Sequence, residues 1–231
     1  MKTLKIKSVV DVITADLRHK IIRGVLTSGQ RIKEVEIARE FNTSRPPVRE
    51  SFKILESEGL ITIRPRRGAF VSEITQKDIW EIYTVYAVLT DLAIELAIEK
   101  VSAEDIGKLE NCIKRMEEGV YQEPEDVDKY HRYHRIFHEN ILQIAENNRL
   151  MKICISLNNQ TLKFSKIIFS NKEYRMASFK KHQEILETIR MKDKDQAKRV
   201  SYDHVMEGMK NLQGIFEELK IEAGDPRSNG H

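Results

Sequence analysis

The stretch Ser44-Arg45-Pro46-Pro47-Val48-Arg49-Glu50 decides how the first third of this 231-residue chain is interpreted. Ser44 is a favourable residue directly before a helix, and prolines are tolerated in a first helical turn because its N–H groups have no partner within the helix. Arg45 and Arg49 are four residues apart, so they lie on one face of that helix. The stretch therefore predicts a helix that carries two arginines near its N-terminus.

The flanking sequence predicts a winged helix-turn-helix around this third helix. Apolar residues recur at the helical period over residues 8–24 and 34–41, and the third helix ends at Gly59. Two β-prone runs, 60–63 and 69–71, enclose a basic segment, which predicts a hairpin with a basic tip. In such a fold the third helix enters the major groove of DNA.

The residues predicted to bind DNA lie at the start of the third helix and at the tip of the hairpin. Arginine is well shaped to bond guanine O6 and N7 together, and a serine hydroxyl or a free N–H group at a helix start can bind a phosphate. A glycine in the tip lets the backbone come close to DNA. The set is Ser44, Arg45, Pro46, Arg49, Arg66, Arg67 and Gly68.

Charge and composition agree with a two-part soluble protein. Residues 1–74 hold 15 Lys and Arg against 9 Asp and Glu, a net charge of +6, while the remainder carries −3 and the whole chain +3. A basic part joined to an acidic part suggests a nucleic-acid-binding module attached to another domain. No apolar run approaches the roughly 20 residues of a membrane helix, and no signal peptide is evident. With two cysteines, Cys112 and Cys154, that fit a reducing compartment, we expect a cytoplasmic protein without a membrane partner.

From residue 75 onward the sequence predicts helices alone. The expected helices cover about 75–100, 102–120, 126–146, 148–170, 173–191 and 195–219. The fold class is therefore mainly α, with an N-terminal winged helix-turn-helix and a small β-hairpin wing, followed by an all-α bundle of about six helices. We expect three segments: 1–74 as the DNA-binding domain, 75–222 as an effector-binding, metal-binding and dimerisation domain, and 223–231 as a disordered tail.

Four histidines lie on otherwise apolar stripes of three of these helices. His134 and His138 are four residues apart on one helix, and His182 and His204 lie on two others. A single buried histidine is explained by hydrogen bonds, but four that converge would share one divalent cation well, because each neutral imidazole needs a partner. Ligation by nitrogen alone fits zinc or nickel. His131 is a spare candidate one turn away.

The first part resembles the GntR family of bacterial regulators. The resemblance rests on G-V-L-T-S-G-Q-R-I, E-I-A-R-E-F-N-T-S-R-P-P-V-R-E-S-F-K-I-L-E-S-E-G-L-I and R-R-G-A-F-V, which together span Gly24 to Val71. It implies that Ser44, Arg45 and Arg49 contact the operator, with wing residues near Gly68 assisting. Pro46 departs from the family, in which threonine is more usual, and removes a possible hydroxyl contact to phosphate.

The second part, about residues 78–219, resembles the FCD ligand-binding domain of the fatty-acid-regulator-like GntR subfamily. The matching motifs are x-FH, then KHQEILETI, then A-x(6)-H. The resemblance implies a divalent metal held by an Asp and three His, the latter at His138, His182 and His204; His134 stands in the Asp position and removes a negative charge. The family's R-x-x-L-E is here Tyr86-Ala87-Val88-Leu89-Thr90, so Tyr86 is the candidate effector-pocket residue, without the charge of an arginine.

These features favour a sequence-specific DNA-binding transcriptional regulator, not an enzyme, whose operator affinity is controlled by a small molecule bound in a metal-containing helical domain. One alternative is a regulator that senses zinc or nickel directly. Another is a metal-dependent hydrolase fused to a DNA-binding domain, although its general base would have to be Glu139, which points off the histidine stripes. We expect a homodimer on a near-palindromic double-stranded operator, because one winged helix reads too few base pairs for selectivity.

Overall fold

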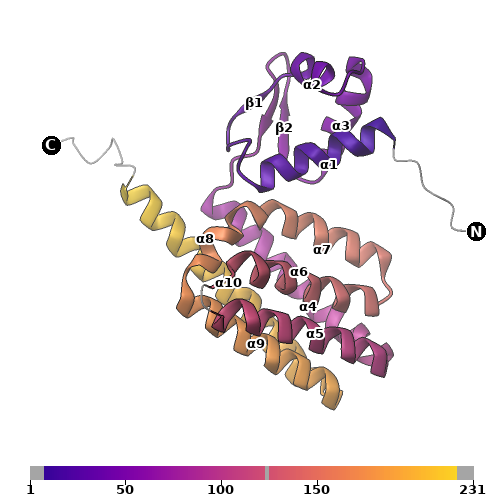
Figure 1. The fold of residues 1–231 in the computed structure, drawn as a ribbon, viewed down its shortest axis with the longest axis vertical. Coiled ribbons are helices and arrows are strands. Elements are labelled where there is room, and N and C mark those ends of the chain that lie inside the picture. Colours follow the sequence, from indigo (N-terminus) through magenta and orange to yellow (C-terminus); the bar gives the residue numbers. More distant parts are fainter. Residues whose placement is uncertain (1–7, 123–124, 223–231) are drawn as a thin grey trace, which may run out of the picture. The chain divides into compact units, whose positions relative to one another are not determined.

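The structure, a computed structural model, describes residues 8–122 and 125–222, and Figure 1 shows their helices and strands. The chain divides into two compact units, the first ending at Ile74 and the second beginning at Thr75, with Ser156–Lys163 counted in the first. The fold class is mainly α, as predicted, with one small sheet in the first unit. The tail predicted over 223–231 lies outside the described residues.

The first unit is a winged helix-turn-helix. Its elements are α1 (Val9–Ile22), β1 (Arg31–Ile32), α2 (Glu34–Glu40), α3 (Arg45–Ser57), β2 (Ile61–Arg64) and β3 (Gly68–Val71). The strands form one antiparallel sheet in the order β1-β3-β2, so β3 lies in the middle. The turn between β2 and β3 is the predicted basic tip.

The orientation of α3 is fixed by its apolar face. Val48, Phe52 and Leu55 recur at the helical period, and all three are buried in the core of the first unit. Because this face is buried, Arg45 and Arg49 remain exposed. The packing of α3 therefore leaves its two arginines available to a ligand in solvent.

The sheet corrects the prediction of a simple hairpin wing. Strand β1 pairs with β3, placing Arg31 opposite Phe70 and Ile32 opposite Ala69. Strands are predicted from the alternation of apolar and polar side chains, and a strand of two residues is too short to show it. The additional strand, β1, buries Ile32 and anchors the base of the wing.

Beyond Ile74 the described chain contains helices only. They are α4 (Gln76–Lys100), α5 (Ala103–Tyr121), α6 (Val127–Ile144), α7 (Asn148–Thr161), the 3-10 helix η1 (Leu162–Phe164), α8 (Ser165–Ser170), α9 (Lys172–Met191) and α10 (Lys194–Glu222). Helix α4 packs along α10 and α5 along α6, while α9 lies against both α5 and α10 (Figure 1). This packing brings α6, α9 and α10, which carry the four histidines, into one bundle. None of the described helices is both long and apolar enough to cross a membrane.

Two helix starts in this unit follow the sequence closely. Thr75 and Ser102 accept hydrogen bonds from the N–H groups of Asp78 and Asp105, and each aspartate accepts one in return from the capping residue's N–H. These reciprocal capping boxes fix where α4 and α5 begin. They agree with the helix starts predicted at about residues 75 and 102.

The prediction of one continuous helix over residues 148–170 is wrong. The structure breaks it into α7, η1 and α8, so the bundle has one more break than the sequence suggests. The break follows Asn158, Asn159 and Thr161, which are weak helix formers, and the Thr161 hydroxyl donates to the Asn158 carbonyl at 3.0 Å. The apolar pattern continues through the break and therefore conceals it.

Candidate metal centre and DNA-contact surface

The four predicted histidines meet inside the second unit. His134 and His138 project from α6, His182 from α9 and His204 from α10. Each offers one ring nitrogen to a group whose members all lie within 4.8 Å of one another. Within the group, His138 Nε2 and His182 Nε2 are separated by 3.0 Å.

The cluster lies beside aromatic rings. The His134 ring is 4.9 Å from that of Phe169, and the His182 ring is 5.2 Å from that of Phe137, measured between centroids. Burial lowers the pKa of His138 to about 3 and that of His182 to about 4. It also holds the pKa values of His134 and His204 well below 6.5, with the neighbouring imidazoles adding to the effect. All four rings are therefore neutral at pH 7, the form in which imidazole binds metals.

A hydrogen bond orients one of these rings toward the centre of the cluster. His182 Nδ1 lies 2.6 Å from the backbone carbonyl of Ser178, so Nδ1 carries the proton and Nε2 presents its lone pair to the cluster. The Ser178 hydroxyl in turn accepts from the Tyr130 hydroxyl at 2.9 Å. Metal-binding histidines are commonly held by such a bond from the second ring nitrogen. The donor set thus fits a divalent ion in both its chemistry and its outer support.

Two other residues singled out from the sequence lie close to this cluster. Tyr86, the candidate for the effector pocket, lines a cavity of about 10 Å³ together with His138. The other lining residues are Thr90, Ala93, Ile94, Ile141, Leu142 and Ser201. His131, the spare candidate, is not among the four grouped nitrogens; its ring lies 5.8 Å from that of Phe169. Glu139, the general base that a hydrolase would need, is 3.5 Å from Arg135 in an ion pair.

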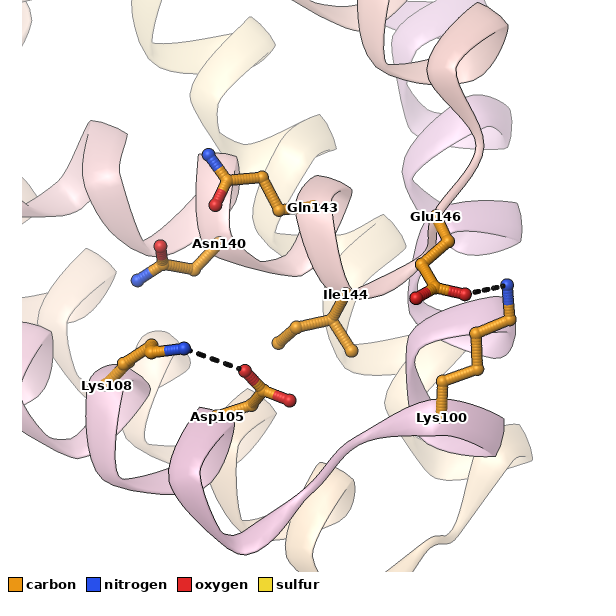
Figure 2. A pocket seen from close by; sticks show the side chains of 7 residues that line it. All are labelled: Lys100, Asp105, Lys108, Asn140, Gln143, Ile144 and Glu146. Atoms are coloured by element: carbon orange, nitrogen blue, oxygen red, sulfur yellow. Dashed lines mark hydrogen bonds and ion pairs between the residues drawn. The ribbon is translucent and has the colours of Figure 1, made fainter. Parts of the chain in front are cut away.

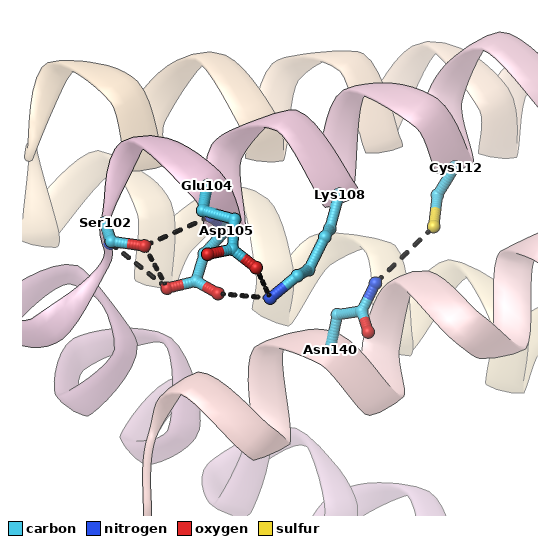
Figure 3. A network of polar contacts seen from close by, with 6 residues as sticks. All are labelled: Ser102, Glu104, Asp105, Lys108, Cys112 and Asn140. Atoms are coloured by element: carbon cyan, nitrogen blue, oxygen red, sulfur yellow. Dashed lines mark hydrogen bonds and ion pairs between the residues drawn. The ribbon is translucent and has the colours of Figure 1, made fainter.

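A larger hollow, of about 180 Å³, lies where the end of α4, the start of α5 and the end of α6 meet (Figure 2). Its charged side chains already pair with one another: Lys100 with Glu146 at 3.1 Å and Lys108 with Asp105 at 3.2 Å. Figure 3 shows the continuation of this network, in which Asn140 Nδ2 lies 3.6 Å from Cys112 Sγ. The sequence analysis did not predict this network. It joins α5 to α6, and the packing of those two helices accounts for it.

The predicted DNA-contact residues at the start of α3 are all solvent-facing. Ser44 precedes the helix, but its side chain makes no capping hydrogen bond. Pro46 and Pro47 occupy the second and third helical positions, where the N–H groups that a capping serine bonds would be, and proline has none. Ser44 is the N-cap residue, as predicted, but its hydroxyl accepts no hydrogen bond from the helix and is left for another partner.

The second group of DNA-contact residues forms the wing tip. Arg66 and Arg67 are exposed in the turn between β2 and β3, and Gly68 begins β3 with a φ of 94°, a value that favours glycine. Nearby, the Arg64 guanidinium lies 4.7 Å above the Phe70 ring, a cation–π contact that the sequence did not single out. The wing thus presents several guanidinium groups on a short turn.

Comparison with known families matches both units. Residues 10–71 match the bacterial regulatory proteins of the gntR family, and residues 81–207 match the FCD domain. The chain belongs to the GntR family and carries an FCD domain. Both resemblances found in the sequence are thereby confirmed.

Relatives of this FCD-containing regulator have names that agree with the family. The uncharacterized HTH-type transcriptional regulator YdhC of Bacillus subtilis is 29% identical over 205 residues, 88% of this chain and 91% of YdhC. The gluconate operon transcriptional repressor of B. subtilis is 34% identical over 142 residues, 61% of this chain and 57% of the repressor. The coarse function of the chain is therefore DNA-binding transcriptional regulation.

Solved structures share the fold. E. coli McbR/YncC superposes with a TM-score of 0.77 at 20% identity, over 91% of this chain and 100% of McbR/YncC. At this identity the likeness concerns the fold alone. The fold of this chain thus has a counterpart among solved structures.

Proposed function

We propose that this chain is a sequence-specific regulator whose operator affinity is controlled by a small molecule bound in a metal-containing FCD domain. The observation that carries the proposal is the convergence of four neutral imidazoles on one point, with His182 and His204 buried and His134 and His138 half-buried. Unpaired buried polar groups are costly, and a shared cation would satisfy all four nitrogens. The contacts to DNA would come from the exposed arginines of α3 and of the wing tip.

The metal would be zinc or nickel. The ligands would be His134, His138, His182 and His204, and among the described residues no carboxylate or thiolate belongs to the group. Ligation by nitrogen alone suits these ions better than magnesium or manganese. When bound, the ion would act as a Lewis acid toward an oxygen of the effector.

The effector would be an anion. Four neutral imidazoles leave the two positive charges of a bound ion without compensation from the protein groups that hold it. Beside His138, Tyr86, Thr90 and Ser201 line the small cavity. Burial raises the pKa of Tyr86, which keeps its phenol protonated and able to donate to an anionic oxygen.

A direct metal sensor is the second candidate. Its support is the size of the cavity beside His138, about 10 Å³, which is about the room that one water molecule needs. In that case the ion itself would be the signal. The two candidates differ in whether a metabolite is needed once the metal is bound.

A homodimer on a near-palindromic operator would supply the specificity that one reading head lacks. The dimer face would be the exposed apolar side of α4, formed by Trp80, Val85, Val88 and Leu92, which are between 42% and 63% exposed. Apolar side chains gathered on one side of a long helix are typical of an interface. As a regulator of bacterial transcription, the dimer would act in the cytoplasm.

Operator titration tests the proposal. Chelator-treated protein is bound to a duplex selected by the protein from a random-sequence pool, first with zinc or nickel alone and then with fractionated small metabolites. The proposal predicts that metal alone changes affinity little and that a metabolite fraction changes it strongly, only in the presence of metal. A full response to metal alone would favour the sensor, and no response to either would contradict both.

Sedimentation tests the dimer face. Val88→Glu places a charge in the middle of the apolar side of α4 and should convert the dimer to a monomer at micromolar concentration. Val25→Glu makes the same change at an exposed position of the first unit, 67% exposed, and should leave the dimer intact. A wild-type chain that sediments as a monomer would overturn this part of the proposal.

A further inference from the structure

The two arginines on the exposed side of α3 differ in one respect. Arg49 donates its Nε–H group to Glu34 Oε2 at 2.9 Å. No such partner occurs for Arg45 among the residues that the structure describes. One arginine is therefore held by a carboxylate, and the other is unrestrained.

The hydrogen bond to Glu34 leaves the two Nη groups of Arg49 available for a contact with a base. A guanidinium offers five N–H donors in a flat fork, and Glu34 takes the one on Nε. The two Nη groups remain, and two parallel bonds are what guanine O6 and N7 accept. The Arg49 side chain is 60% exposed, so its Nη groups are accessible to a partner in solvent.

Glu34 is the more anchored of the two partners. It is the first residue of α2, which packs on α3, and its side chain is 31% exposed against 60% for Arg49. A carboxylate at a helix N-terminus is also stabilised by the helix dipole. The anchored carboxylate can therefore restrict the rotamers of the longer, more exposed arginine.

We propose that Glu34 is a positioning residue for sequence recognition, holding Arg49 in the orientation that reads a base pair. The inference rests on the proposed DNA contact of Arg49. An arginine that is already ordered loses less side-chain entropy when it binds DNA, so binding is stronger. This gain in affinity applies only to the base sequence that the ordered side chain fits. Glu34 would therefore raise selectivity although its charge repels phosphate.

Charge and positioning make opposite predictions, so they can be separated. Removing a carboxylate near DNA raises affinity for every sequence, since it removes a repulsion from phosphates. Removing a positioning contact lowers affinity for the preferred sequence alone. Glu36 is the matched control, because it lies in the same first turn of α2 and pairs with Lys33 at 2.7 Å, not with an arginine of α3.

The experiment measures the ratio of affinities for a selected duplex and a scrambled duplex, using the full chain. Glu34→Ala should lower this ratio about fivefold, the effect expected for freeing one long side chain. Glu34→Gln, which keeps an oxygen for the Nε–H group, should restore much of it. Glu36→Ala should leave the ratio unchanged, and thermal unfolding of each variant checks that the fold is intact.

Combination with Arg49→Ala completes the test. If Glu34 acts through Arg49, Glu34→Ala should have no further effect on the ratio in an Arg49→Ala background. The inference is overturned if Arg49→Ala lowers the ratio while Glu34→Ala does not, or if Glu36→Ala lowers it equally. If Arg49→Ala itself leaves the ratio unchanged, the proposed contact of Arg49 with bases is wrong, and Glu34 loses its role with it.

Discussion

The two units place their functional side chains in opposite environments. The winged unit exposes Arg45 and Arg49 on the outer side of a helix whose inner side is packed. The FCD unit buries His182 and His204 among apolar residues. Exposed groups can be changed without disturbing a core, whereas buried polar groups affect stability and function together. Substitutions should therefore separate DNA binding from stability in the first unit and couple metal binding to stability in the second.

The largest expected effect is a loss of stability of the FCD unit in mild acid. In chelator-treated protein the buried imidazole of His182 has a pKa of about 4, below the 6.5 of an unfolded chain. Between these values the unfolded state binds more protons, so stability is complete above pH 6.5 and falls as the pH drops toward 4. From pH 7 to pH 5 His182 alone should lose about 2 kcal/mol, and its three neighbours add to this.

Urea unfolding at several pH values measures this loss. His182→Asn should reduce the dependence on pH, since it removes one of the groups responsible. His19→Ala, at an exposed position of α1, should leave the dependence as it is in wild type. An identical pH dependence in His182→Asn would show that the buried imidazoles do not cause it.

The next effect belongs to α3. Arg45→Ala and Arg49→Ala should each weaken binding to the preferred duplex by about 1–3 kcal/mol, the value of a bidentate contact with a base. Both side chains are exposed, so thermal unfolding should remain close to that of wild type. Affinity for duplexes altered at single base pairs would check the assignment, because each variant should lose discrimination at one position of each half-site.

The smallest effect belongs to the wing. Arg66→Ala and Arg67→Ala should weaken binding evenly across sequences and reduce the slope of log affinity against log salt by about 0.9 for each phosphate that the variant no longer neutralises. Lys53→Ala, an exposed position farther along α3, gives a comparison for loss of one positive charge. If the wing variants change sequence preference and the α3 variants do not, the roles of the two elements are reversed.

The sequence predicts most of the first unit because its signals are local. Ser44, the prolines after it and the basic segment before Gly68 each mark an element boundary, and the elements follow as expected. Two features of this unit could not be predicted, because each depends on contact between residues far apart in the sequence. The two residues of β1 become a strand only through β3, and the ion pair between Glu34 and Arg49 joins residues 15 positions apart.

The histidine cluster could be predicted because its members lie on apolar stripes at helical spacing. The structure brings together the four chosen from that pattern and leaves His131 outside the group. The hydrogen bond from His182 to the Ser178 carbonyl could not be predicted, since a backbone oxygen has no signature in the sequence. Nor could the break after Thr161, where the apolar pattern of a continuous helix persists through η1.

The central claim is that the four histidines hold one divalent ion, and metal content tests it most directly. Full-length protein from cells supplied with zinc and nickel is analysed for metal, together with His182→Ala and the matched variant His131→Ala. The account predicts about one ion per chain in wild type and in His131→Ala, none in His182→Ala, and a rise in thermal stability when zinc or nickel is added to the chelator-treated wild type. A wild-type protein that contains no metal and is not stabilised by either ion would contradict the account, and the four residues would then be core histidines that bond one another.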